Sequence, residues 1–138
     1  MEHSEVEKVI AHEGFDAHNA IHVIRCGEGM SEVRVELTDK SLNVWRIPHG
    51  GLLYSIADVA AGAAATGGRD NGVVTVSGTL NFIRAAKGAK SLTARAQEEK
   101  QGRTTSFYSV RITDEEETLI ATASFIMHNT TAYTERQA

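Results

Sequence analysis

The chain has 138 residues, which suits one domain and is too short for two of ordinary size, so we expect a single domain over residues 1–138. Its formal net charge of −4 at pH 7 argues against a nucleic-acid-binding protein, which would carry a basic surface. One cysteine cannot form an internal disulfide, and no apolar run approaches the roughly 20 residues that cross a bilayer. With no signal pattern at the N-terminus, we expect a cytoplasmic protein that binds neither nucleic acid nor membrane.

The first part of the chain predicts a helix followed by two strands. Residues 3–12 fit a short amphipathic helix. Residues 19–26 fit a strand that ends at Cys26, for which a structural thiol is a better interpretation than a nucleophile. In residues 31–38, valine and leucine alternate with glutamate and arginine, which is typical of an antiparallel strand with one buried face.

A long helix is predicted from about Gly50 to Thr66. The irregular stretch before it ends near Pro48, the only proline, whose ring suits a position at or just before the first turn. Gly67 and Gly68 end the helix. The helix is rich in alanine and apolar on nearly all sides, so we expect it to be buried and closely approached by other elements.

The remainder of the chain predicts strands only. Their expected bounds are Val73 to Arg84, Ser91 to Lys100, Thr104 to Thr113 and Leu119 to His128. Gln101 and Gly102 mark a hairpin between the second and third of these strands. One long helix packed against a mainly antiparallel sheet gives an α+β layer.

The motif His49-Gly50-Gly51 stands at the start of the long helix. The first N–H groups of a helix have no partner inside it and carry a partial positive charge. Glycine leaves these groups open, so the turn can hold a carbonyl oxygen that becomes negative during a reaction. Two glycines before a helix are also common, and alone they indicate only a flexible start.

Two polar residues near this motif have open interpretations. Asp58 lies within an apolar helix, where carboxylates are rare unless they are paired or functional. It is either a functional acid or part of a solvated stripe with Tyr54 and Ser55, which lie at helical spacing. Asn43 is either a group that orients water or a substrate carbonyl, or a loop residue that satisfies its local backbone.

These features resemble the PaaI-like branch of the hotdog-fold thioesterases. The resemblance rests on Asn43, on the motif at residues 49–51 and on its spacing to Asp58. Residues 75–88 and 99–104 are also similar to the family's later strand and turn segments, so the likeness covers most of the chain. The resemblance implies an α+β hotdog fold, in which an antiparallel sheet wraps around one long central helix.

The resemblance also implies an enzyme, an acyl-CoA thioesterase that acts on aromatic, phenylacetyl-type, or medium-chain acyl groups. It assigns the backbone N–H of Gly50 to the thioester carbonyl, with His49 beside it. It assigns Asn43 to the carbonyl or the leaving sulfur. Asp58 is expected to activate water or to attack the carbonyl directly, and Thr75 is expected to help hold the water.

The spacing between Gly50 and Asp58 predicts a site shared by two chains. Eight residues of helix span about 12 Å. An acid must lie within about 3 Å of the group it serves, or one water away, so the two residues cannot act together within one chain. A two-fold dimer with facing helices brings Gly50 of one copy near Asp58 of the other. The resemblance implies the same dimer, often doubled into a tetramer.

Basic residues near two turns are candidates for binding the phosphates of coenzyme A. Arg84, Lys87 and Lys90 lie near one turn and Arg103 lies at another, although solvated turn residues are an equally good interpretation. Gly51 completes the expected substrate-binding set. No cofactor is expected, since coenzyme A is part of the substrate. No metal is expected either, because the loosely spaced histidines lack a cysteine or acid in a ligand pattern.

Two other functions remain open at this point. A hotdog hydratase or dehydratase pairs a histidine with an acid, and His49 could take that part. A non-catalytic acyl-CoA-binding protein is the second alternative. The aromatic residues Trp45, Tyr54 and Phe82 either line a pocket for an aryl group or belong to the core.

Overall fold

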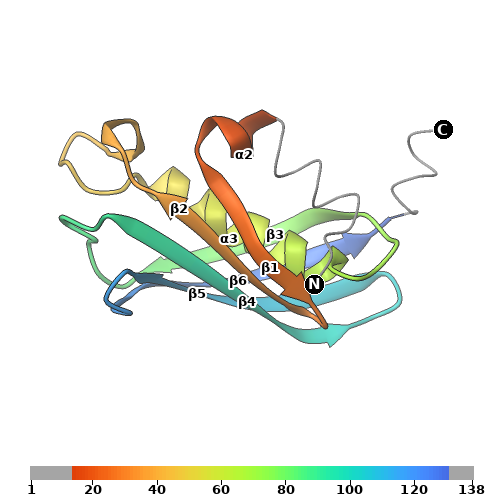
Figure 1. Cartoon of the computed structure of the whole chain (residues 1–138). Coiled ribbons are helices and arrows are strands. Elements are labelled where there is room, and N and C mark those ends of the chain that lie inside the picture. Colours follow the sequence, from red (N-terminus) through yellow and green to blue (C-terminus); the bar gives the residue numbers. More distant parts are fainter. Residues whose placement is uncertain (1–13, 131–138) are drawn as a thin grey trace.

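The computed structural model describes residues 14–130, and Figure 1 shows how their elements are arranged. In chain order the elements are α2 (Gly14–His18), β1 (Ile21–Gly27), β2 (Met30–Glu36), the 3-10 turn η1 (Asp39–Ser41), α3 (Gly50–Thr66), β3 (Val73–Phe82), β4 (Ser91–Gln101), β5 (Thr105–Asp114) and β6 (Leu119–Asn129). Within these residues, no helix has the length and apolar character that a membrane crossing requires.

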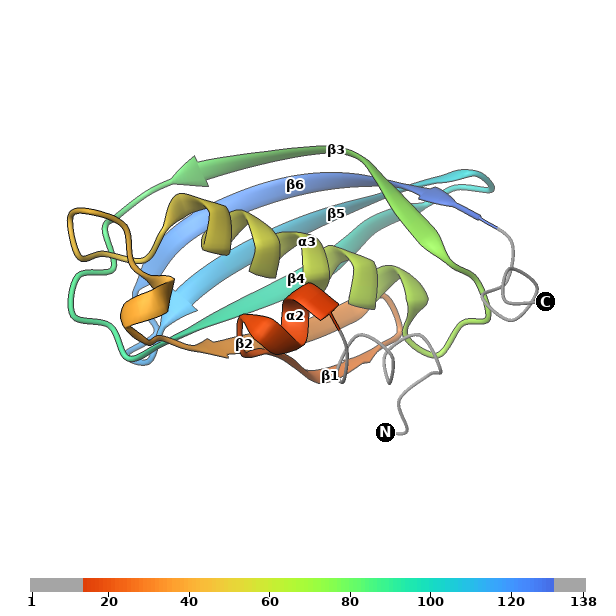
Figure 2. The same cartoon turned by 90° about the horizontal axis from the view of Figure 1, so that it is seen from above.

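The six strands form one antiparallel sheet in the order β1-β2-β4-β5-β6-β3. Figure 2 shows this sheet curving around α3, which lies along its concave face. The helix connects β2 to β3, and β3 then pairs with β6 at the far edge. This is the predicted architecture, an antiparallel sheet wrapped around one long helix.

The core lies between α3 and the inward-facing side of the sheet. Ten of the 17 residues of α3 are buried, and most of them are alanine. Small side chains let the strands approach the helix closely, and the larger volume comes from the sheet. The sheet contributes alternate residues of its strands, as the two-residue period requires. Buried examples are Val33, Val35, Leu92, Val110, Ile112 and Phe125.

The strand β3 is an open edge of the sheet. None of its ten residues is buried, and its outer side pairs with no other strand among residues 14–130. Val76 and Phe82 are 63% and 64% exposed. A β-bulge between Thr75 and Ser77 shifts the phase of the strand. Such a long apolar edge is a surface that another chain can pair with.

The predicted helix and strands are confirmed. The helix α3 has the predicted bounds, and each strand agrees with its prediction to within a few residues. The short helix α2 is not predicted by the sequence, because it buries no side chain and so carries no periodic signal. The helix predicted over residues 3–12 lies outside the described residues. Cys26 is buried near the end of β1, as a structural thiol would be.

Candidate active site

A pocket of about 320 Å³ opens beside the first turn of α3. Three parts of the chain meet there: the loop before α3, the helix start and the end of β3. Its lining residues are Asn43, Ile47, Pro48, Gly50, Leu53, Phe82, Ile83, Arg84, Ala85, Ala86 and Ile120. The structure therefore gathers Asn43, Gly50 and Arg84, three of the predicted site residues, around one cavity.

The backbone N–H of Gly50 is available to a ligand. Leu52 and Leu53 both donate their N–H groups to the His49 carbonyl, at 3.0 and 3.3 Å. Gly51 donates its N–H to the His49 side chain at 2.8 Å. Among the described residues, the Gly50 N–H donates no hydrogen bond. The first turn therefore presents one free donor to the pocket, as an oxyanion site requires.

His49 is the N-cap residue of α3. Its Nδ1 atom accepts the hydrogen bond from Gly51, so a neutral ring carries its proton on Nε2. This contact satisfies one of the unpaired N–H groups of the helix start. It also removes Gly51 from the donors that could reach a substrate, although Gly51 remains exposed next to the pocket.

Asn43 holds its loop with one end of its side chain. Its carboxamide oxygen accepts from the backbone N–H groups of Trp45 and Ile47, at 2.9 and 3.4 Å. These contacts fix the orientation of the amide, because only its oxygen can accept them. The remaining NH₂ group can donate to a carbonyl oxygen or to sulfur. Both interpretations of Asn43 are therefore compatible, since one side chain can brace the loop and face the pocket.

Asp58 lies two turns further along α3 and is half-buried. The hydroxyl of Thr75, on β3, donates to its carboxylate at 2.5 Å. This hydroxyl also lies 3.4 Å from the sulfur of Met127. The contact between Thr75 and Asp58 joins two predicted site residues. It leaves the rest of the carboxylate free to accept a proton from water.

A second carboxyl group near Asp58 is missed by the sequence predictions. Asp16, on α2, has a raised pKa because it is partly desolvated and because the negative charge of Asp58 is close. In Figure 2, α2 lies on the same side of the sheet as α3. Residues 14–18 show no periodicity and no motif, so no sequence signal placed this acid near the site.

The two groups of site residues are separate within the chain. The pocket at the helix start includes Asn43 and Gly50 but neither Asp58 nor Thr75. The donors for a carbonyl oxygen and the acid that could activate water therefore lie on different parts of α3. This agrees with the separation of about 12 Å expected from helix geometry.

The predicted basic residues also lie in two separate places. Arg84 lines the pocket, while Lys87 and Lys90 are exposed on the turn that follows it. The Glu115 carboxylate accepts a hydrogen bond from the Lys90 N–H at 3.1 Å and so anchors this turn. Backbone hydrogen bonds, first from its own N–H and then from Lys90, lower the pKa of the Glu115 carboxyl. Arg103 lies in the hairpin between β4 and β5, at the opposite end of the sheet.

The three aromatic candidates are not core residues. Trp45 is 78% exposed in the loop before α3. Tyr54, on α3, is 39% exposed, and Phe82, at the end of β3, is 64% exposed. The ring of Phe82 lies directly against Gly50, where an added Cβ would be 3.1 Å from its Cζ atom. Glycine at position 50 therefore allows the close approach of this ring.

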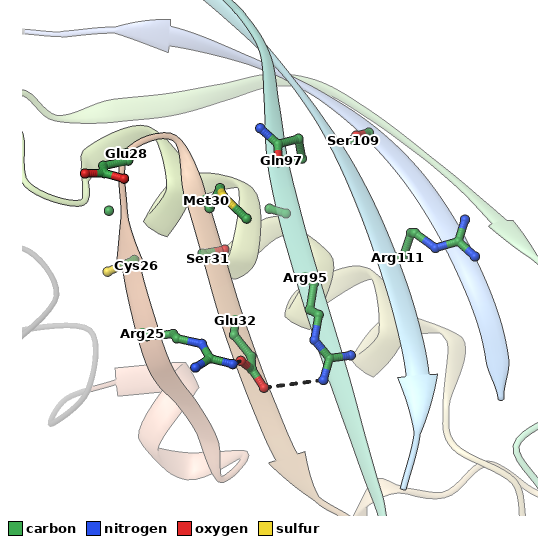
Figure 3. A pocket seen from close by; sticks show the side chains of 12 residues that line it. Arg25, Cys26, Glu28, Met30, Ser31, Glu32, Arg95, Gln97, Ser109 and Arg111 are labelled. Carbon is green, nitrogen blue, oxygen red and sulfur yellow. Dashed lines mark hydrogen bonds and ion pairs between the residues drawn. The ribbon is translucent and has the colours of Figure 1, made fainter. Parts of the chain in front are cut away.

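A larger pocket, of about 480 Å³, lies on the outer face of the sheet, opposite α3 (Figure 3). Arg25 and Arg95 lie there on either side of Glu32, and both form ion pairs with it. The pocket contains none of the predicted site residues, so we place the candidate site at the helix start despite its smaller volume.

Comparisons with known proteins identify the family of this chain. A family model described as Thioesterase superfamily matches residues 47–121, which include the helix start and all of α3. The acyl-coenzyme A thioesterase PaaI of Escherichia coli (strain K12) is 33% identical over 101 residues, 73% of this chain and 71% of that protein. The chain therefore belongs to the thioesterase superfamily, and it is an enzyme of the acyl-CoA thioesterase type.

Solved structures support the same assignment. The E. coli PaaI protein, from the phenylacetic acid degradation operon, superposes with a TM-score of 0.79 at 28% identity, covering 85% of this chain and 84% of that one. A hypothetical thioesterase from Streptococcus pneumoniae TIGR4, solved with coenzyme A, gives a TM-score of 0.77 at 29% identity and covers 86% and 94%. The predicted hotdog fold and PaaI-like family are thereby confirmed, whereas the roles of individual site residues stay predictions.

Proposed function

We propose that this protein hydrolyses acyl-CoA thioesters to a free acid and coenzyme A, at a site shared by two copies of the chain. The observation that carries the proposal is that the hydrogen-bond donors and the acid lie at different turns of α3. Its first turn offers a free N–H beside the Asn43 amide, with no acid in that pocket, and its third turn offers Asp58 held by Thr75. A complete hydrolytic site needs both parts within contact distance.

In the proposed reaction, the thioester carbonyl oxygen accepts hydrogen bonds from Gly50 N–H and the Asn43 amide. Asp58 of the partner subunit takes a proton from a water, which forms the new C–O bond. The negative charge that develops on the carbonyl oxygen is stabilised at the helix start. Collapse of this intermediate breaks the C–S bond, and the leaving thiolate takes the proton from Asp58. Direct attack by the carboxylate, through an anhydride, is the second form of the proposal.

The contacts of His49 favour hydrolysis over hydration or dehydration. A hydratase needs a histidine and an acid poised to move protons together. Here the Nδ1 atom of His49 accepts from the Gly51 N–H, so this nitrogen serves as the helix cap and is not available to exchange a proton with an acid. A non-catalytic binding protein would not require an acid opposite the carbonyl site.

The open edge of β3 supports the oligomer that this site needs. Pairing of β3 with its copy about a two-fold axis would continue the sheet and cover exposed Val76 and Phe82. We propose a homodimer of this kind, which can double into a tetramer, in the cytoplasm. Two-fold symmetry reverses one copy, so it also brings Arg103 of the partner subunit toward the N-terminal end of α3, where Arg84 lines the pocket.

The acyl group is proposed to be aromatic, of the phenylacetyl type, or medium-chain. The similar E. coli protein comes from a phenylacetic acid degradation operon, and a similar streptococcal protein was solved with coenzyme A. A panel of acetyl-, hexanoyl-, decanoyl-, benzoyl- and phenylacetyl-CoA, with detection of free thiol, tests the proposal. Release of thiol from at least one ester is expected. Loss of the acyl-CoA without free thiol would point to a hydratase, and no change in any ester would remove the catalytic function.

A further inference from the structure

The helix α3 and the strand β3 touch at successive levels of the candidate site. At the first level, the ring of Phe82 lies against Gly50. At the third level, the Thr75 hydroxyl donates a hydrogen bond to the Asp58 carboxylate at 2.5 Å. Between them lies Tyr54, four residues from both Gly50 and Asp58 and therefore on the same face of the helix.

Tyr54 is held firmly at this middle level. Its ring packs on the buried Phe125, with centroids 5.2 Å apart at an interplanar angle of 59°. Its hydroxyl lies over Gly78, where an added Cβ would come within 2.5 Å of the Tyr54 oxygen and 2.4 Å of Phe125. Glycine in the middle of a strand costs stability, so a contact that only glycine allows explains its presence. Tyr54 nevertheless remains 39% exposed, on the side of α3 that faces the open edge.

Two-fold symmetry gives this middle level a special position. If Gly50 of one copy faces Asp58 of the other, then Asp58 of the first faces Gly50 of the second. The residue midway between them, Tyr54, must then face its own copy across the axis. The strand leads to the same point, because the midpoint between Phe82 and Thr75 falls beside Gly78, directly under Tyr54.

We propose that the Tyr54 side chains of two copies meet at the dimer axis and form the wall between the two active sites. This inference rests on the proposed shared site and adds to it the residue that limits acyl length. The basic turn with Arg84 and Lys87 lies at the N-terminal end of α3, so coenzyme A enters from that end. The thioester carbonyl is held at Gly50, and the acyl chain continues along the helix until it reaches the two tyrosine rings.

Cross-linking tests the position of Tyr54 without reference to activity. A residue on a two-fold axis lies next to its own copy, so Tyr54→Cys should be joined into a covalent dimer by a short bis-maleimide. Gly62→Cys is a matched control on the same helix face, two turns away, where an added side chain meets nothing within 4 Å. Neither this control nor the wild type, whose Cys26 is buried, should cross-link. A dimer in solution that gives no cross-linked Tyr54→Cys would overturn the inference.

Substrate length tests the role of the tyrosine wall. Tyr54→Ala should raise the ratio of kcat/KM for decanoyl-CoA over butyryl-CoA by about tenfold or more, because it opens space at the end of the acyl pocket. Tyr54→Phe, which keeps the ring, should retain the wild-type order of chain lengths. An equal change for all lengths in Tyr54→Ala would refute the wall. Wild-type protein that releases no thiol from any ester would instead refute the proposed function.

Discussion

The first and third turns of α3 supply opposite chemistry. The pocket at the first turn contains hydrogen-bond donors, namely the free Gly50 N–H and the Asn43 amide from the preceding loop, and it contains no acid. The third turn presents the Asp58 carboxylate, which accepts from one hydroxyl. Its charge contributes to the raised pKa of a second acid, Asp16. One rigid helix can hold donors and acid at a constant separation, but it cannot bring them together. A second copy of the same helix, reversed by symmetry, can do so.

The largest expected effect comes from removing the acid at the third turn. Asp58→Asn should lower kcat by roughly 10²-fold or more, because an amide cannot take a proton from water. Folding should be retained, since the amide can still accept the Thr75 hydroxyl. Steady-state kinetics with the best ester of the panel measures the effect. Asp70→Asn, in the exposed turn after α3, is the matched control. Near-normal turnover of Asp58→Asn would remove this residue from the mechanism.

Mixing two impaired variants tests whether the two turns act across copies. Asp58→Ala and Asn43→Ala are mixed under conditions that allow subunit exchange, which mass spectrometry confirms. A mixed dimer has one site with every group intact and one site with both defects. Random exchange makes about half the dimers mixed, so about a quarter of wild-type activity should return. Activity that stays at the level of the separate variants, despite confirmed exchange, would show that each site is built within one chain.

A smaller loss is expected at the first turn. Asn43→Ala should reduce transition-state stabilisation by about 1–3 kcal/mol, the range for one hydrogen bond to a developing charge. Since the Asn43 oxygen also braces its loop, Asn43→Asp is a useful companion. It keeps an oxygen for the Trp45 and Ile47 N–H groups but lacks the NH₂ donor. Both variants should lose kcat/KM, whereas Asn43→Asp should keep the melting temperature. Unchanged kcat/KM in both would exclude the amide from the site.

The smallest effect is expected from Asp16. Burial and the charge of Asp58 raise its folded-state pKa, so the folded protein disfavours the ionised form. The resulting cost is absent below the ordinary aspartate pKa and develops as the pH rises through the raised value. Asp16→Asn should therefore increase stability at pH 7 by less than about 1 kcal/mol, because the group is only half-buried and partly screened. Urea unfolding at pH 7 and pH 3 should show the gain only at pH 7.

The same unfolding measurements can test the charge coupling directly. In an Asp58→Asn background, the gain from Asp16→Asn should shrink, because one source of the raised pKa is absent. An identical gain in both backgrounds would mean that burial alone affects Asp16, and the two acids would then be independent.

The sequence by itself determined the elements and the chemical candidates. Pro48, the glycines around α3 and the alternating pattern of the strands are local signals, and they predicted α3 from Gly50 to Thr66 and every strand of the sheet. The rare position of an acid in an apolar helix singled out Asp58 in the same way. These features depend on residues close together in the chain, so a single sequence is enough to read them.

Only the tertiary structure decided which of these elements are neighbours. The placement of β3 beside β6, its bulge, the bond from Thr75 to Asp58 and the contact of Tyr54 with Gly78 all join segments far apart in the chain. The position of Asp16 near Asp58 and the position of Arg103 at the far end of the sheet also depend on how distant segments pack. Local periodicity states which face of an element is apolar, but not what packs against it. That choice follows from how all the elements together bury the face of α3 and satisfy their hydrogen bonds.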